Sequence, residues 1–277
     1  PALFIFTESE VENIFSNDNK NQLFMNVEVA LAEAQSELGI IPDWAAKEFR
    51  QKADIKYLEH KEVVKENSKV RHGLVARLNV WKRSLNDEAS EFLHYGATTV
   101  DIMDTVLVLQ IDNSLDYLIK DLLEVETHLL KLTKEHLNTY MAGRTLGQHA
   151  LPITFGKKTG TWLAENRRNI ERLEHVRSKV QRSGILKGAV GSYLGLGKQA
   201  IETEAIMMKK LGLAEPSKDD WHGIRDVFAE YAVTLAIISK SFGRIGNELT
   251  LLQMTELGET EEAVSYTHLR AHETPCH

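Results

Sequence analysis

Two segments of this sequence concentrate side chains that can bind an anion and transfer a proton. Residues 94–105 read His-Tyr-Gly-Ala-Thr-Thr-Val-Asp-Ile-Met-Asp-Thr, and residues 143–156 read Gly-Arg-Thr-Leu-Gly-Gln-His-Ala-Leu-Pro-Ile-Thr-Phe-Gly. Each stands directly before a long stretch with helical apolar periodicity, so its polar side chains lie beside the free backbone N–H groups of a helix start. Such helix starts bind anions, and two of them in one helical chain predict a site for a small polycarboxylate.

The first segment offers hydrogen-bond donors beside a capping carboxylate. We expect His94, Thr98 and Thr99 to donate hydrogen bonds to substrate carboxylates, and we count the two threonines among the catalytic candidates. Asp101 is expected to cap the helix that follows, and we place it with His94 among the substrate-binding candidates. The alternative is a capped helix start without a ligand, because Thr and Asp are common N-cap residues.

The second segment combines a guanidinium, a hydroxyl, an amide and an imidazole on one turn. These groups belong to Arg144, Thr145, Gln148 and His149. Together they can bind a carboxylate and carry a proton at neutral pH. We therefore take His149 as a catalytic candidate and the other three as substrate-binding candidates. The alternative is a polar loop in which His149 caps or packs.

A third polar cluster opens the last long helical stretch. It reads Trp-His-Gly-Ile-Arg-Asp and contains His222 and Arg225. The positive end of a helix dipole favours an anionic group there, so both are substrate-binding candidates, with a plain helix start as the alternative. A run of basic residues at 167–182 suggests nucleic-acid binding, but glutamates are mixed with it and favour a solvated helix face.

Composition excludes several classes of protein. The 277 residues, 43% of them hydrophobic, suffice for one large or two ordinary domains with a substantial core. A formal charge of -7 argues against a general nucleic-acid binder, although it leaves room for a local basic pocket. No window approaches the roughly 18 apolar residues of a membrane span, and the start lacks a signal-peptide pattern. Because Cys276 is the only cysteine, we expect no internal disulfide and a soluble, cytoplasmic protein.

The apolar pattern predicts an all-α fold built on three long helices. Steps of four and three residues run from Ile111 to His136, and the same rhythm spans 227–252. Between them we expect a helix that begins at Pro152 and continues to Val180. No alternating run of β-branched residues is bounded by turn residues, so we expect almost no strand.

The rest of the pattern defines two helical regions. Residues 10–50 carry an amphipathic helix broken at 39–42, and shorter helices follow. The glycines of residues 183–197 are incompatible with a regular helix and predict a loop. We therefore divide the chain into a small N-terminal helical domain at 1–93 and a central, incomplete bundle of long helices at 94–263, which forms part of a tetrameric helical core.

Residues 264–277 break this pattern. They resemble translated vector sequence, so we exclude them from the fold. The tail contains His268, His272 and Cys276, but we do not assign it a metal site. We expect neither a metal nor a cofactor in this protein.

The motifs resemble those of the fumarase/aspartase superfamily of lyases. Residues 94–263 are similar to its adenylosuccinate lyase and 3-carboxy-cis,cis-muconate cycloisomerase branch, and residues 5–93 resemble its N-terminal helical domain. The two signature segments precede Trp-His-Gly-Ile-Arg-Asp at 221–226 and Gln-Met-Thr-Glu-Leu-Gly-Glu at 253–259, in the order that the family has. The resemblance implies a homotetramer whose core is a bundle of long helices, with each active site built from three subunits.

The resemblance also implies the chemistry, which is elimination without a cofactor. A base removes a proton from the carbon next to a carboxylate, and hydroxyls, amides and cationic groups stabilise the dianionic intermediate before the C–N or C–O bond breaks. In these lyases the base is a serine on a mobile loop reading Ser-Ser-x-Met-Pro-x-Lys-x-Asn-Pro. This sequence departs after Glu259 into the foreign tail. We therefore expect the chain alone to be inactive, and to associate non-natively through unmatched apolar helix seams.

Individual positions bear on the substrate that the resemblance implies. Leu146 stands where adenylosuccinate lyases usually have a histidine, the candidate acid. The cycloisomerases also lack that histidine, and their Leu-Gln-His-Ala-Leu-Pro is close to residues 148–152. In contrast, residues 188–191 and His72, a further substrate-binding candidate on a helical stretch, are more similar to adenylosuccinate lyase, although a lone helical histidine is often structural. Ile224 stands where both commonly have glutamine.

We therefore favour a cycloisomerase-like lyase that acts on a polycarboxylate. The first alternative is an adenylosuccinate lyase that releases fumarate in purine biosynthesis. A second alternative, from a different class, is a homologue that is kept as a structural or binding protein without turnover.

Overall fold

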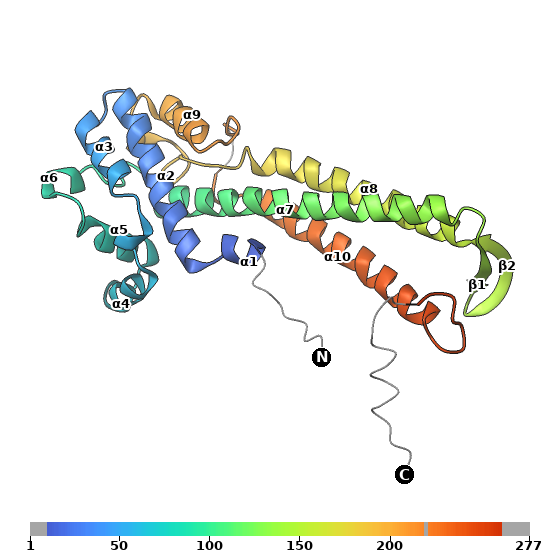
Figure 1. Ribbon diagram of the computed structural model, residues 1–277. Coiled ribbons are helices and arrows are strands. Elements are labelled where there is room, and N and C mark those ends of the chain that lie inside the picture. Colours follow the sequence, from blue (N-terminus) through green and yellow to red (C-terminus); the bar gives the residue numbers. More distant parts are fainter. Residues whose placement is uncertain (1–9, 219–220, 262–277) are drawn as a thin grey trace, which may run out of the picture. The chain divides into compact units, whose positions relative to one another are not determined.

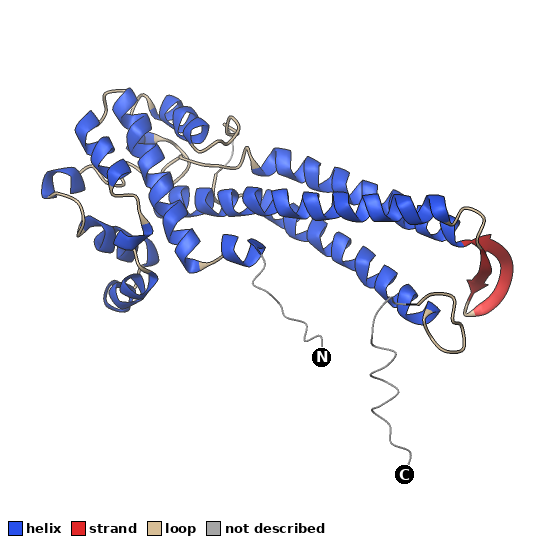
Figure 2. Ribbon diagram, in the orientation of Figure 1, coloured by secondary structure: helices blue, strands red, loops and turns tan. Residues whose placement is uncertain are grey.

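The computed structural model describes residues 10–218 and 221–261, and helices make up most of this part of the chain (Figures 1 and 2). The tail at 264–277, with its three histidines and its cysteine, lies outside the described residues. The elements in chain order are α1 (Glu10–Ile14), α2 (Asn17–Glu37), α3 (Asp43–Gln51), η1 (Ile55–Tyr57), α4 (His60–Val70), α5 (Gly73–Lys82), α6 (Asp87–Ser90), α7 (Thr99–Glu135), β1 (Tyr140–Thr145), β2 (Gln148–Thr154), α8 (Phe155–Val180), η2 (Leu194–Leu196), α9 (Ala200–Lys210) and α10 (Asp226–Leu252). The predicted all-α class is confirmed, with one two-stranded sheet added to it.

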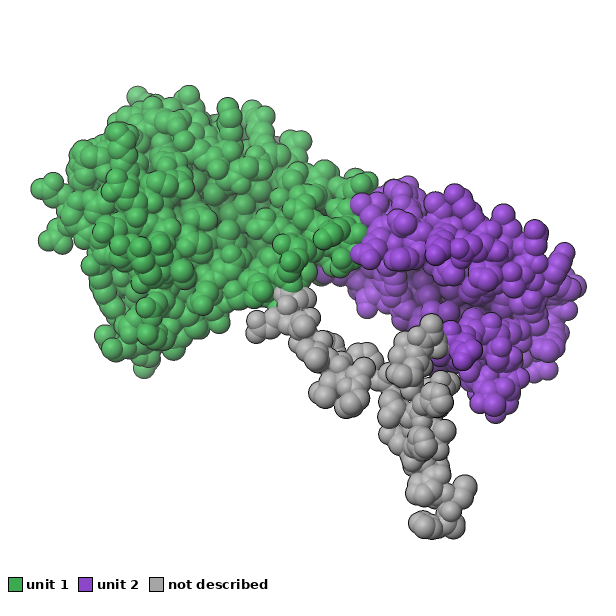
Figure 3. All heavy atoms as spheres, in the orientation of Figure 1, with its two compact units in different colours: residues 1–121, 172–232 green, residues 122–171, 233–277 purple. Residues whose placement is uncertain are grey.

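The chain forms two compact units, which Figure 3 colours separately. Unit 1 comprises residues 1–121 and 172–232, and unit 2 comprises residues 122–171 and 233–277. The long helices α7, α8 and α10 each contribute residues to both units. The domain boundary that we place between residues 93 and 94 stays a prediction.

Helix α2 lies at the centre of unit 1 because apolar side chains are buried on all of its faces. It packs against α3 and α9. Its C-terminal end is a Schellman motif, in which Gly39 N donates to Ser36 O at 3.0 Å and Ile40 N donates to Gln35 O at 2.8 Å. The helix break that we expect at 39–42 is therefore confirmed.

Trp81 on α5 connects three helices of unit 1. Its ring is fully buried and meets Phe24 of α2 edge-on, with ring centroids 6.3 Å apart. It also contacts Phe49 of α3, with ring centroids 6.1 Å apart. The indole N–H donates to Lys52 O at 2.9 Å, so the polar atom of this large side chain is paired inside the core.

The three long helices expected from the apolar periodicity are present as α7, α8 and α10. On α7 the expected seam is buried at Ile111, Leu115, Leu122 and Leu129, which recur at steps of four and seven residues. The glycine-rich segment at 183–197 contains only the short 3₁₀ helix η2. None of the described helices is long and apolar enough to cross a membrane.

The expectation of almost no strand is wrong at residues 140–154. Strands β1 and β2 pair in antiparallel register through a two-residue turn at Leu146 and Gly147. Both turn residues have positive φ, 52° and 75°, as a type I′ hairpin requires. Pro152, which we expect at a helix start, lies in β2 opposite Ala142, and α8 begins only at Phe155. The proline is tolerated because a strand of a two-stranded ribbon has one unpaired edge.

Replacing Trp81 with alanine is expected to lower the free energy of unfolding by about 3–5 kcal/mol, because it removes a fully buried ring and leaves a cavity between three helices. Trp44 is a matched control, since its ring lies 44% exposed against Phe92. Trp44→Ala should cost clearly less. Urea unfolding followed by circular dichroism measures both. Equal losses in the two variants would contradict the position of Trp81 as the anchor of this core.

Candidate functional site

The first predicted segment lies at the start of α7, in unit 1. Residues 94–98 form an irregular corner in which His94 and Gly96 have positive φ values of 63° and 76°. A Cβ atom on Gly96 would lie 3.1 Å from Gly195 O and 3.0 Å from Leu196 Cδ2. The corner therefore packs its backbone directly against the glycine-rich loop, and only glycine fits at position 96.

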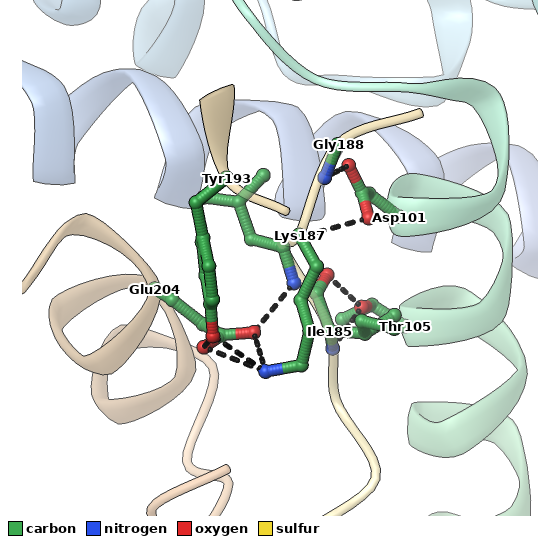
Figure 4. Close-up of polar contacts among 8 residues, drawn as sticks. Asp101, Thr105, Ile185, Lys187, Gly188, Tyr193 and Glu204 are labelled. Atoms are coloured by element: carbon green, nitrogen blue, oxygen red, sulfur yellow. Dashed lines mark hydrogen bonds and ion pairs between the residues drawn. The ribbon is translucent and has the colours of Figure 1, made fainter. Parts of the chain in front are cut away.

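Asp101 is fully buried and binds three backbone N–H groups. Its carboxylate accepts hydrogen bonds from Thr98 N at 3.0 Å, Lys187 N at 2.9 Å and Gly188 N at 2.9 Å, the last two drawn in Figure 4. The residue therefore caps α7 and at the same time attaches the glycine-rich loop to it. One turn further along α7, Thr105 accepts from Ile185 N at 3.1 Å and donates to Ile185 O at 3.2 Å. The predicted contact of Asp101 with substrate stays a prediction.

Lys187 and Glu204 form a buried ion pair behind the glycine-rich loop. Their side chains are only 1% and 2% exposed, and Lys187 Nζ lies 3.1 Å from both carboxylate oxygens of Glu204. Tyr193 completes the cluster, since its hydroxyl lies 2.6 Å from Nζ and donates to Glu204 Oε2 at 2.7 Å. Figure 4 shows both side chains of the loop converging on Glu204 of α9. Burial raises the pKa of Glu204, opposed by the hydrogen bonds from Leu186 N and Tyr193 and by the charge of Lys187.

The cluster of Lys187, Tyr193 and Glu204 also fixes the backbone of the glycine-rich loop. Tyr193 N also donates to Lys187 O at 3.0 Å, so the backbone turns back on itself between these residues. The sequence predicts the loop but not the cluster. The one signal is a lysine in the apolar run Ile-Leu-Lys, which points to a paired interior charge.

His94 lies beside a buried carboxylate of α2. Its Nδ1 atom is 2.7 Å from Glu28 Oε1, and the Glu28 side chain has no exposed surface. Burial of the imidazole opposes its protonation, but the charge and hydrogen bond of Glu28 and the charge of Asp101 outweigh it. The pKa of His94 is therefore raised. The sequence predicts His94 and not its partner, which is 66 residues away.

The third predicted cluster is also part of unit 1. Arg225 donates to Asp104 Oδ2 at 2.7 Å, which connects the start of α10 to α7. Burial raises the pKa of Asp104, opposed mainly by Arg225. His222 stacks beside Trp221, with ring centroids 4.3 Å apart, and its buried Nδ1 has no hydrogen-bond partner in the described part of the chain. Asp104, Trp221, His222 and Ile224 line one small pocket.

His72 lies at the first residue before α5. Its Nδ1 accepts a hydrogen bond from Val75 N at 3.3 Å, so this exposed histidine caps the helix. This geometry agrees with the structural alternative for His72. Its contact with substrate stays a prediction.

The second predicted segment forms the β-hairpin of unit 2. Arg144 and His149 face each other across the two strands, and Arg144 Nη2 lies 3.5 Å from His149 Nε2. Arg144 also makes a bidentate ion pair with Glu259, in which Nη1 lies 2.7 Å from Oε2 and Nη2 lies 2.9 Å from Oε1. The hydrogen bond from Arg144 lowers the pKa of Glu259, so this carboxylate stays ionised. A ligand carboxylate that binds Arg144 must therefore displace Glu259, a residue to which the sequence assigns no role.

The candidate residues are thus divided between the units. Unit 1 contains His72, His94, Thr98, Thr99, Asp101, His222 and Arg225, and unit 2 contains Arg144, Thr145, Gln148 and His149. Within unit 1 the structure places the corner at the start of α7, the glycine-rich loop and the start of α10 in contact. Within unit 2 it brings the hairpin residues together with Glu259.

Replacing Lys187 with methionine is expected to lower the free energy of unfolding by about 3–5 kcal/mol, because Glu204 is then left as a buried unpaired carboxylate. The double variant with Glu204→Gln should recover part of this loss. Lys47→Met, which breaks an exposed ion pair with Asp43, serves as the control and should change stability little. Urea unfolding of the wild type, the single variants Lys187→Met and Glu204→Gln, their double variant and the control measures the coupling, and strictly additive losses at 187 and 204 would contradict an energetic coupling of the pair.

Leu146→Asn is expected to stabilise the chain by about 1 kcal/mol, because leucine is strained at the positive φ of 52° that asparagine tolerates. Leu151→Asn is the matched control, since Leu151 is an exposed strand residue with ordinary φ. It should bring no gain. The midpoint of urea unfolding measures both, and a loss of stability in Leu146→Asn would show that the leucine side chain has stabilising contacts in solution.

Comparison with known proteins extends these observations. A family profile described as "Lyase" matches residues 1–268. The N-acetyl-S-(2-succino)cysteine lyase of Dickeya dadantii is 38% identical over 260 residues, which are 94% of this chain and 57% of that protein. The adenylosuccinate lyase of Methanocaldococcus jannaschii is 33% identical over 277 residues, which are 100% of this chain and 60% of that protein. The chain therefore spans less than two thirds of these curated relatives.

Solved structures show the same relationship. The fumarate lyase from Mesorhizobium sp. BNC1 has a TM-score of 0.85 and 34% identity, over 90% of this chain and 58% of that chain. The 3-carboxy-cis,cis-muconate lactonizing enzyme from Pseudomonas putida has a TM-score of 0.87 and 28% identity, over 93% of this chain and 59% of that chain. The chain belongs to the lyase family of the fumarase/aspartase superfamily.

Proposed function

We propose that the full-length protein is a cofactor-independent lyase that cleaves a succinyl thioether and releases fumarate. A base removes a proton from the methylene carbon next to one carboxylate, the C–S electrons leave with sulfur, and the C=C bond of fumarate forms. By the family resemblance a serine on a mobile loop acts as the base. A thiolate and fumarate are the products, and the thiolate takes a proton from solvent.

The observation that carries this proposal is Leu146 at the tip of the hairpin. The resemblance to adenylosuccinate lyases leads us to expect a histidine acid there, and leucine cannot donate a proton. An amine nitrogen is a poor leaving group without an acid, because its anion is very basic. A thiol has a pKa of about 8.5, so a thiolate departs near neutral pH without help. Loss of the acid therefore fits cleavage of a C–S bond better than cleavage of a C–N bond.

The named relatives support the same substrate class. Two N-acetyl-S-(2-succino)cysteine lyases are 38% identical to this chain, and the adenylosuccinate lyase compared above is 33% identical. Both names include a succinate-derived group. The cycloisomerase that we favour from the motifs becomes the second candidate. It is supported by the sequence at 148–152 and by the similarity to solved muconate-lactonizing enzymes.

The candidate residues receive the following roles. His94, Thr98 and Thr99 at the start of α7 bind and orient the substrate carboxylates through an imidazolium and two hydroxyls. Arg144 binds a carboxylate in place of Glu259, and His149 beside it relays the abstracted proton from the serine base to solvent. Thr145, Gln148, His72, Asp101, His222 and Arg225 complete the proposed substrate-binding set.

We further propose that the protein works as a homotetramer in which several subunits build each site. Unit 2 exposes apolar side chains on its long helices that a partner copy would cover. They are Leu123 and Leu130 on α7 and Val233, Ile237 and Leu251 on α10, each more than 40% exposed. Patches of this kind mark interaction surfaces.

The test is turnover by the full-length native gene product. We expect fumarate release from N-acetyl-S-(2-succino)cysteine, followed by ultraviolet absorbance, with little activity on adenylosuccinate or 3-carboxy-cis,cis-muconate. His149→Ala should lower kcat by about 10²–10⁴-fold because the proton relay is lost, whereas Leu146→Ala should retain most of the activity. Turnover of the muconate alone would favour the second candidate. A folded tetramer that turns over none of the three would support a binding or structural homologue instead.

A further inference from the structure

We infer that Glu28 is a positioning residue, a buried carboxylate that orients the His94 ring and keeps it cationic so that Nε2 is presented to a substrate carboxylate. This inference rests on the proposed function, because it takes His94 as a ligand of the substrate. The role of Glu28 is to act through His94 and not by contact with substrate. It lies on α2, in the N-terminal region, whereas His94 belongs to the corner before α7.

The geometry determines which ring nitrogen is free for a ligand. Nδ1 lies 2.7 Å from Glu28 Oε1, so it carries a proton and donates to that oxygen. The Glu28 side chain is 0% exposed, whereas that of His94 is 16% exposed. The carboxylate therefore lies on the buried side of the ring, and Nε2 remains as the donor for an anion. A carboxylate that fixes the far nitrogen of a histidine also fixes its orientation and stabilises its protonated form.

The corner is attached to α2 at a second point. Gln35 Nε2 donates to Tyr95 O at 2.7 Å. Glu28 and Gln35 are seven residues apart and therefore lie on the same face of α2. His94 itself has a positive φ of 63°, a conformation that is uncommon for a residue with a side chain. Two side chains of one helix thus hold an unfavourable backbone turn and aim its imidazole, as expected where strain serves a site.

Glu28 and His94 depend on each other for charge balance. Glu28 Oε2 is buried without a hydrogen-bond partner among the described residues, so His94 is the group that balances its charge. Removing the proton from His94 would leave a buried carboxylate without a cation, which is unfavourable. The other charged groups that act on His94 are Asp101 from α7, which favours the cation, and Lys82 from the end of α5, which opposes it.

The sign of the pH dependence follows from the raised pKa of His94. Stabilisation by the pair is fully present below the unfolded pKa of about 6.5, and it is lost as pH rises through the folded pKa. Substrate affinity that depends on the imidazolium falls over the same range. Below a pH of about 6.5, the Glu28–His94 pair causes no pH dependence of either stability or substrate affinity.

The first experiment measures the proton directly. Histidine rings of the chain are isotopically labelled, and the NMR signal of His94 is assigned by its loss in His94→Gln. We expect the wild-type His94 to titrate above 6.5 and Glu28→Gln to lower its pKa by about one unit or more, a tenfold or larger change in proton affinity. Glu37→Gln is the matched control, because Glu37 lies on the same helix and pairs with the exposed Lys210. It should leave His94 unchanged.

A wild-type His94 that titrates below 6.5 would overturn the inference without any variant, so the test stands even if Glu28→Gln does not fold. A folded Glu28→Gln protein in which the pKa does not move would overturn it equally. Glu28→Asp, which keeps the charge on a shorter side chain, should retain a higher His94 pKa than Glu28→Gln.

The second experiment uses the full-length enzyme and separates the inference from the proposed reaction. In the wild type, kcat/KM should fall as pH rises through the His94 pKa, and in Glu28→Gln this fall should begin at lower pH. Calorimetric affinity for fumarate should follow the same shift. A pKa that moves as expected in an enzyme without turnover of the thioether supports the pair and counts against the reaction. Turnover whose pH profile does not change in Glu28→Gln would refute the positioning role.

Discussion

The three hydrogen bonds accepted by Asp101 are the constraint on which the unit 1 site depends. A carboxylate without exposed surface is tolerable only when its oxygens are bonded, and here backbone N–H groups from the corner and from the glycine-rich loop supply the bonds. One side chain thereby fixes the start of α7, the position of Thr98 and the entry into the loop at Lys187. Without it, α7 would lose its cap and the two hydrogen bonds that Asp101 accepts from the loop, and the packing of Gly96 against Gly195 would be left to join the corner to the loop.

Four cationic side chains among the described residues of the candidate regions, three in unit 1 and one in unit 2, have a carboxylate partner. The pairs are Glu28 with His94, Glu204 with Lys187, Asp104 with Arg225 and Glu259 with Arg144. The partner of His94 is completely buried behind the ring, so a ligand can approach the other nitrogen without displacing it. Arg144 is different, because Glu259 binds both Nη atoms of its guanidinium in a bidentate pair. An anion that binds Arg144 would exchange one carboxylate for another, whereas under our proposal an anion at His94 adds a charge-assisted hydrogen bond.

The sequence predicts those parts of the structure that depend on local pattern. The long helices follow from apolar steps within α7 and α10, and the break after α2 follows from the glycine and proline that surround it. The hairpin is missed because its strands carry glycine and proline and few β-branched residues, and because its turn has leucine where asparagine is usual. The candidate polar residues are identified by type. Their partners are not, since Glu28 and His94 lie 66 residues apart and only the folded chain brings them together.

Leu146 at the tip of the hairpin bears both on the stability of the turn and on the proposed chemistry. It is 100% exposed and has a positive φ, so an apolar side chain is placed in water in a backbone conformation that disfavours it. Both costs fall at one residue, two positions from Arg144 and three from His149, as expected where strain serves a site. Under the proposed reaction, an apolar tip excludes water from the carboxylate and leaving group beside it, and it cannot protonate the leaving group. Sulfur suits the proposed reaction at such a tip, because a thiolate is a polarisable and stable anion that leaves without being protonated.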